Sequence, residues 1–429
     1  MIILAQNGKH DIGLVGHGKI MKRRNFIKLG ATTLAFGNVT ATYADDKQKD
    51  DPAVLFLFLS GGASHIETFN PIPYAPADRR SVTGARKTNV AGIELGGLFE
   101  NLASRTDKIA IPRAFGHRDQ NHASAVHWVI TGEANFGAGT SSKWPSYGSC
   151  MAKYHGPNTD NGLPTYIKMG EIQHDDAAWL GGKYMGFDAT REGRKDLQLL
   201  GKSDDFRKRL YALNVIDNGF IGRNQQMSKD WRDLREQSVD IILGSTSKAF
   251  KVEEDSHYDR FKATSFGTDC LTAIRLLEAG SKFVTLNMGG WDMHQNIGAS
   301  LETRQKELDA YLCKVMDLLE HRGMYERVML IVTSEFGRTP KVNQNQGRDH
   351  FGKLAPLMIS CGSYEMGRTI GASNGNADEA ESGRCTPEDL AWTIFDHLDM
   401  EKKTRWTGVD GRPHDIVKED SKNILKEIV

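Results

Sequence analysis

Short, uninterrupted apolar runs alternate along this chain with segments of helical periodicity. The clearest run is Ala53–Leu59, which contains only Ala, Val, Leu and Phe. A run without polar alternation is typical of a strand buried on both faces, as in the centre of a parallel sheet. Similar runs predict further strands at about 283–287, 328–332 and 357–359, and a short strand at 108–111.

Helical spacing of apolar residues fills the intervals between these strands. We expect helices at about 123–130, 270–279 and 301–319, with part of another at 98–102. Gly280 follows the second of these at the position where a left-handed residue commonly ends a helix. Strands that alternate with helices favour an α/β fold, with a mainly parallel central sheet and helices on both faces.

Composition narrows the function only slightly. The 429 residues carry 55 basic and 55 acidic side chains, and 39% are hydrophobic. This balance gives no support for a nucleic-acid partner. The length alone suggests two or three domains, but α/β enzymes of this length often form one. The five cysteines include no Cys-x-x-Cys pair, so a zinc knuckle or dithiol redox site is not expected, and we predict buried structural thiols.

The N-terminal segment resembles a twin-arginine export signal. Arg23 and Arg24 precede a modest apolar run at 29–39, and Ala44 offers a small residue for cleavage. The run is shorter than the about 20 apolar residues of a membrane-spanning helix, so we expect no integral membrane anchor. The predicted partner is the twin-arginine translocation machinery, and the predicted location is periplasmic or secreted.

This interpretation divides the chain into an upstream segment with a signal peptide, residues 1–44, and a single domain, residues 45–429. Residues 1–20 precede the plausible start at Met21. Between about 191 and 266 the chain becomes polar and charged with helical spacing, and we expect a helical elaboration of the domain there.

Histidines and acidic residues gather where the predicted strands end. Because ligands of open α/β sheets bind at the carboxyl ends of the strands, these side chains are expected at one edge. Imidazole with carboxylate is a donor set for a divalent metal, for which we expect zinc, with manganese or calcium as alternatives. The candidate ligands are His65, Glu67, His122, Asp292, His294, Glu335, Asp349 and His350.

Some of these residues have a structural alternative. Asp292 and His294 are two residues apart and would point the same way from an extended strand end. Glu335 precedes a Gly–Arg pair and is able to bind Arg338 instead of a metal, and Asp349 is able to pair with Arg348.

Several motifs resemble the domain-of-unknown-function 1501 family, in order and over roughly residues 53–428. They are Gly61–Pro71, Asn121–Ala125, Gly290–Asn296, Ser334–Pro340, Gly347–Gly352, Thr386–Ala391 and Gly411–Pro413. The resemblance implies export by the twin-arginine route and an alkaline-phosphatase-like fold. Members of that superfamily hydrolyse or transfer phosphate and sulfate esters, usually with metal.

This chain lacks some of the residues that sulfatases use for catalysis. Sulfatases place a nucleophile nine residues before a Thr–Gly pair, and that count from Thr131 leads to His122, with Ser124 two residues further on. Sulfatases also have paired aspartates after the first strand, where this chain has Gly61 and Gly62.

His122 therefore has three interpretations: metal ligand, covalent nucleophile or helix cap, although Asn121 is the better cap by type. The catalytic candidates are His122 or Ser124 as nucleophile or acid/base, with Arg118 or Arg338 holding the anion.

The expected function is metal-dependent hydrolysis of a phosphate or sulfate ester, on a small molecule or a glycan. The alternative is an inactive member of the same fold that binds an anionic ligand, such as a glycan, or a protein partner.

Overall fold

The computed structural model describes residues 4–6, 12–16, 19–20, 51–135, 141–158, 161–190, 245–408 and 411–428. Contacts divide the chain into two units, residues 1–50 and 51–429. The first contains an antiparallel sheet of β1 (Leu4–Gln6), β2 (Ile12–Gly16) and β3 (Lys19–Ile20). The predicted export signal, and the elaboration as far as residue 244, lie outside the described residues.

The second unit is built around an eight-stranded sheet in the order β15-β7-β14-β11-β4-β10-β8-β9. Most neighbouring strands are parallel, and β14 is antiparallel to both of its neighbours. The strands are β4 (Ala53–Phe58), β7 (Ala110–Pro112), β8 (Tyr166–Met169), β9 (Phe187–Asp188), β10 (Phe283–Asn287), β11 (Val328–Thr333), β14 (Leu357–Ser360) and β15 (Arg368–Ile370).

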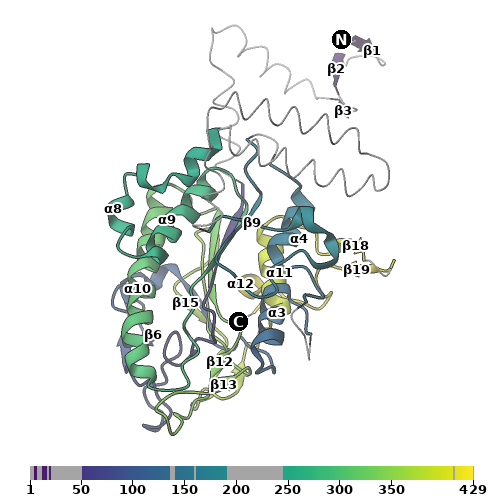
Figure 1. Ribbon diagram of the computed structural model, residues 1–429. Coiled ribbons are helices and arrows are strands. Elements are labelled where there is room, and N and C mark those ends of the chain that lie inside the picture. The colour runs from purple at the N-terminus through teal and green to yellow at the C-terminus, as the bar shows by residue number, and fades with distance from the viewer. Residues whose placement is uncertain are drawn as a thin grey trace. The chain divides into compact units, whose positions relative to one another are not determined.

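Helices cover both faces of this sheet (Figure 1). On one side lie α8 (Tyr258–Phe261), α9 (Ser265–Glu278) and α10 (Ile297–His321). On the other lie α3 (His122–Thr131), α4 (Tyr147–His155), α11 (Pro387–His397) and α12 (Ile424–Glu427). The α/β architecture with a mostly parallel sheet is therefore confirmed.

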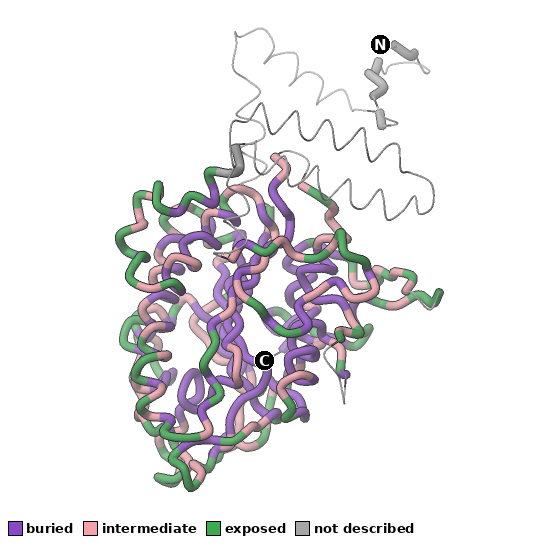
Figure 2. Tube along the Cα trace, viewed as in Figure 1, coloured by how far each residue is buried: buried purple, intermediate pink, exposed green. Residues whose placement is uncertain are grey.

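Strand β4 shows why an unbroken apolar run forms the centre of the sheet. All six of its residues are buried, and its side chains alternate between two separate hydrophobic clusters. Leu55 and Leu57 face the cluster that also contains residues of α9 and α10, whereas Phe56 and Phe58 face the one that contains residues of α3, α4 and α11. Figure 2 shows the sheet buried between helices whose outer faces are exposed.

The predicted C-terminal ends of the helices agree well with the structure, whereas α9 and α10 begin at Ser265 and Ile297, earlier than expected. The C-cap of α9 is Ala279, and Gly280 follows it with a φ of 110°, as expected. Asn121 caps α3 by accepting the backbone N–H groups of Ala123 and Ser124. All five cysteines are buried and unpaired.

Other elements are short. Five 3-10 helices are described: η1 (Leu102–Lys108), η2 (Ala178–Leu180), η3 (Gly182–Tyr184), η4 (Ser245–Phe250) and η5 (Val252–Glu254). Four two-stranded ribbons also occur in the described part: β5 (Ala85–Lys87) with β6 (Glu94–Gly96), β12 (Gly337–Arg338) with β13 (His350–Phe351), β16 (Ala372–Ser373) with β17 (Ala380–Ser382), and β18 (Arg405–Thr407) with β19 (Pro413–Asp415).

The expected helix at 98–102 is replaced by turns that lead into η1. The Asp309 carboxylate accepts the backbone N–H groups of Asn101 and Leu102 and fixes this entry. Among the described residues, no helix is long and apolar enough to span a bilayer.

Candidate metal centre

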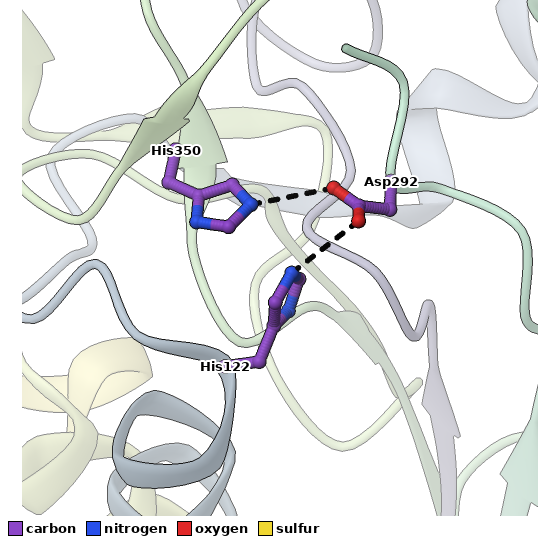
Figure 3. A group of neighbouring side chains, drawn as sticks. All are labelled: His122, Asp292 and His350. Atoms are coloured by element: carbon purple, nitrogen blue, oxygen red, sulfur yellow. Dashed lines mark hydrogen bonds and ion pairs between the residues drawn. The ribbon is translucent and has the colours of Figure 1, made fainter.

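Three parallel strands, β4, β10 and β11, end at the same edge of the sheet, and the loops that follow them meet there. Gly61, in the loop after β4, has a φ of 116°, and a Cβ on it would lie 2.5 Å from the Asp292 backbone nitrogen. This close approach requires glycine and brings the loop after β4 against the loop after β10. The start of α3 and strand β13 complete the edge (Figure 3).

Six predicted ligands form a connected group at this edge, which we call the edge cluster: His122, Asp292, His294, Glu335, Asp349 and His350.

The Asp292 carboxylate lies at the centre of this cluster. One of its oxygens is 3.1 Å from Nε2 of His294 and 3.3 Å from Nε2 of His350. The other oxygen is 3.6 Å from Nε2 of His122. The two Nε2 atoms of His294 and His350 are themselves 2.9 Å apart. All three imidazoles therefore direct the same ring atom at Asp292.

The opposite ring nitrogen of each histidine is held by an oxygen. Carboxylate and carbonyl oxygens only accept hydrogen bonds, so each Nδ1 carries a hydrogen, and in a neutral ring Nε2 then has a lone pair. Partner oxygens of this kind fix the tautomer and orientation of metal-binding histidines. The Nδ1–oxygen distances are 2.8 Å in all three pairs: His122 with Glu335 Oε1, His294 with Asp349 Oδ1, and His350 with Gln120 O.

This arrangement fits a divalent cation. Two lone pairs that face each other at 2.9 Å repel unless a proton or a cation lies between them. Ligand atoms about 2.1 Å from a common ion are roughly 3.0–3.4 Å apart, close to the separations observed here. Donor atoms of His122, Asp292 and His350 all lie within 4.8 Å of one another. Nitrogen with carboxylate suits zinc and also manganese.

Arg338 stabilises the acidic side of the cluster. Its side chain is fully buried, and Nη2 lies 2.5 Å from Asp292 Oδ1. Burial acts to raise the pKa of Asp292, but the hydrogen bond and positive charge of Arg338 outweigh it and hold that pKa below its usual value. Nε and Nη1 donate to the carbonyls of Gly62 and Arg348. Arg338 therefore connects the loops that follow β4 and β10 with the segment that precedes β13.

Glu335 is the buried carboxylate behind His122. Its Oε1 accepts the Gly61 backbone N–H at 2.8 Å, and its Oε2 accepts the Ser334 hydroxyl at 3.0 Å. The hydrogen bond from His122 to Glu335 is the main cause that raises the pKa of His122. The position of Glu335 makes it an orienting group for His122.

A sequence profile described as "Protein of unknown function (DUF1501)" matches residues 51–429. The chain belongs to this DUF1501 family. No curated protein matches it.

Solved structures align with this DUF1501 chain only distantly. The sulfatase PsFucS1 from Pseudoalteromonas sp. aligns at 13% identity with a TM-score of 0.44, over 95% of this chain and 77% of that one. The lipoteichoic acid synthase LtaP from Listeria monocytogenes aligns at 11% identity and TM-score 0.43, over 94% and 81%. The phosphonate monoester hydrolase SpPMH from Silicibacter pomeroyi aligns at 10% identity and TM-score 0.35, over 85% and 75%.

Two of the predicted ligands lie apart from the edge cluster in this DUF1501 protein. Glu67 is completely buried, forms a 2.7 Å ion pair with Arg348, and accepts the Ser81 hydroxyl. His65 is 3% exposed, its Nε2 contacts the Ala377 carbonyl at 3.0 Å, and burial lowers its pKa to about 4. Both side chains are enclosed in the turn after β4.

Two further catalytic candidates, Ser124 and Arg118, have different surroundings from the edge cluster. Ser124 is buried in the first turn of α3, and its hydroxyl contacts the Asn121 carbonyl at 3.5 Å. Since Asn121 caps this helix, the cap role belongs to it and not to His122. Arg118 is exposed and lines a neighbouring cavity.

Two supporting groups could not have been identified from residue types. The Gln120 carbonyl, which holds His350, is a backbone group. His117 places its Nε2 2.5 Å from the Glu335 carbonyl and stacks on Trp128, with ring centroids 5.0 Å apart. The polar loop at 116–122 was the only signal in the sequence for either contact.

Proposed function

We propose that this DUF1501 protein is a metal-dependent hydrolase of phosphate or sulfate esters. The observation that carries the proposal is the convergence of three imidazole Nε2 atoms on the Asp292 carboxylate. A divalent cation at this position supplies Lewis acidity toward a phosphoryl or sulfuryl oxygen and lowers the pKa of water. Hydrolysis then transfers the phosphoryl or sulfuryl group to water, and the alcohol leaves.

The protein's own residues hold and orient the site. His122, His294, His350 and Asp292 supply the donor atoms, with side chains between 24% and 50% exposed, so an ester has access to the cluster. Glu335 and the other Nδ1 partners keep each histidine in the tautomer that presents Nε2.

Water is the nucleophile in this proposal. The Ser124 hydroxyl contacts a carbonyl within its own helix turn, and His122 is oriented as a donor to the ion. Arg338 is a positioning residue, because its guanidinium is enclosed by Asp292 and backbone carbonyls.

The direct experiment measures turnover of p-nitrophenyl phosphate and p-nitrophenyl sulfate. We expect turnover that chelation abolishes and zinc or manganese restores. His294→Ala and His350→Ala should each lose at least about 100-fold in kcat/KM, whereas Ser124→Ala should remain active. His321→Ala, at an exposed position at the end of α10, is the matched control.

Two outcomes would change the proposal. Metal binding without turnover on either ester supports the inactive, ligand-binding alternative. Loss of turnover in Ser124→Ala with full metal content identifies the serine as the nucleophile.

We also propose export by the twin-arginine route, which rests on Arg23 and Arg24 before a short apolar run. Replacing both with lysine should leave uncleaved protein in the cytoplasm. Normal export of that variant would remove the assignment.

A further inference from the structure

A cavity of about 490 Å³ is lined in part by Gly116, His117 and Arg118, in the loop that leads to His122 of the edge cluster. His117 lines this cavity, and the same side chain contacts the carbonyl of Glu335. The volume lies within the range of about 300–1,000 Å³ that is usual for ligand pockets. None of the six edge-cluster residues is among its lining residues, so it is a separate feature.

Two buried polar atoms in the wall of the cavity lack hydrogen-bond partners among the described residues. They are the hydroxyl oxygen of Ser421, a residue that is 3% exposed, and Oε2 of Glu388. The second oxygen of Glu388 is paired with Lys418 at 2.7 Å. Buried polar groups nearly always have partners, so each of these two atoms lacks a hydrogen bond that a molecule bound in the cavity is able to supply.

Basic side chains at the same cavity favour an anion. Arg384 and Lys422 are exposed, line the cavity and form no ion pair with a described residue. Of the acidic residues in the wall, Asp389 uses its carboxylate for the N-cap of α11 and for the Lys422 backbone N–H, and Asp420 is exposed.

We infer that this cavity binds an acidic, hydroxyl-bearing carbohydrate, as the part of the ester substrate that does not react. A sugar hydroxyl is able to donate to Glu388 Oε2 and another to accept from Ser421, while an acidic substituent pairs with Arg384 or Lys422. A bare inorganic anion leaves Glu388 without a donor and is repelled by it. The inference rests on the proposed function, because it names the substrate class of the same protein.

One oligosaccharide is able to reach both places. Arg118 lines the cavity and His122 belongs to the edge cluster, and they are four residues apart in the chain. Four residues span at most about 14 Å, so the two sites lie within the length of a short oligosaccharide.

The experiment measures binding of a chondroitin 6-sulfate disaccharide to the full chain by calorimetry. Ser421→Ala and Lys422→Gln should each raise the Kd about tenfold without changing metal content. The Ser421 hydroxyl has no hydrogen-bond partner in the described part of the chain, so its removal should not affect folding. Lys403→Gln, at an exposed lysine outside the cavity, is the matched control and should bind normally.

The uncharged disaccharide lactose and inorganic sulfate should bind at least about tenfold more weakly than the sulfated disaccharide. Unchanged binding in both cavity variants, or equal binding of inorganic sulfate, would overturn the inference. Disaccharide binding should persist after chelation of the metal. If the disaccharide binds but no ester is hydrolysed, the hydrolase proposal fails and the cavity assignment stands. If aryl esters are hydrolysed but the disaccharide does not bind, the cavity assignment fails and the hydrolase proposal stands.

Discussion

The turn after β4 and the turn after β10 each carry a histidine and an acidic residue two positions apart. In the first, His65 and Glu67 are 3% and 0% exposed. In the second, the side chains of Asp292 and His294 are 50% and 40% exposed. The buried pair has its partners within the protein, namely Arg348 for Glu67 and the Ala377 carbonyl for His65.

The exposed pair instead leaves donor atoms directed at one another. Nε2 of His294 has another imidazole nitrogen at 2.9 Å and the Asp292 carboxylate at 3.1 Å. A histidine and an acidic residue are therefore buried with protein partners in the first turn, and in the second turn they belong to the candidate cation site. The two turns differ in the partners of their polar atoms, and each of the following substitutions changes one of these partners.

The largest effect is expected at Glu67. In Glu67→Gln the fully buried Arg348 loses its only carboxylate partner among the described contacts, which should lower the free energy of unfolding by about 3 kcal/mol. Urea denaturation measures this change. The folded variant should retain its metal.

Glu302→Gln, in the exposed Lys306–Glu302 pair, is the control and should change stability little. If Glu67→Gln has normal stability but has lost metal, the turn after β4 binds the metal and the comparison between the two turns is wrong.

A pH dependence of stability is expected from His65. Its folded pKa is about 4, because burial disfavours the charged ring, whereas the unfolded pKa is near 6.5. Below pH 6.5 the unfolded state takes up a proton that the folded state does not. This contribution to stability is therefore complete above pH 6.5 and is lost as the pH falls toward 4, by about 3 kcal/mol.

The measurement compares the free energy of unfolding of the wild type and His65→Asn across this range. The variant should show a flatter acid limb, since the amide cannot titrate. Parallel curves would mean that His65 does not titrate as a buried neutral ring.

A smaller effect is expected at Glu335, the partner of His122 Nδ1. Glu335→Gln should weaken metal binding about tenfold, because the uncharged amide orients His122 less strongly. Asp349 holds His294 in the same way, but its side chain is 56% exposed, so Asp349→Asn should have a weaker effect. Competition with a chelator measures both affinities. Equal losses in the two variants would argue against burial as the source of the difference.

Much of the fold could be predicted from the sequence, because apolar runs and helical spacing report burial directly. The run at Ala53–Leu59 formed β4, and the spacing at 301–319 lies within α10. The antiparallel direction of β14 could not be predicted, since a buried run has no direction. The turns before η1 depend on the Asp309 carboxylate, which lies more than 200 residues away in the chain.

For the site, residue types selected the right loops but could not tell a buried carboxylate from an accessible one. Glu67 and Asp292 look alike in the sequence, and only tertiary structure places Arg348 against the first. The groups that orient the histidines include the Gln120 carbonyl, and Glu335 is fixed by the Gly61 backbone N–H. Backbone groups are present at every residue, so their roles leave no trace in the sequence.

The most direct test of the central claim is the metal content of the purified protein, measured by inductively coupled plasma mass spectrometry. The account predicts about one divalent ion per chain, zinc or manganese, that His294→Ala and His350→Ala lose and that His65→Asn and folded Glu67→Gln retain. A wild-type protein that binds no divalent metal when it is supplied, or edge-cluster variants that keep their full metal content, would contradict it.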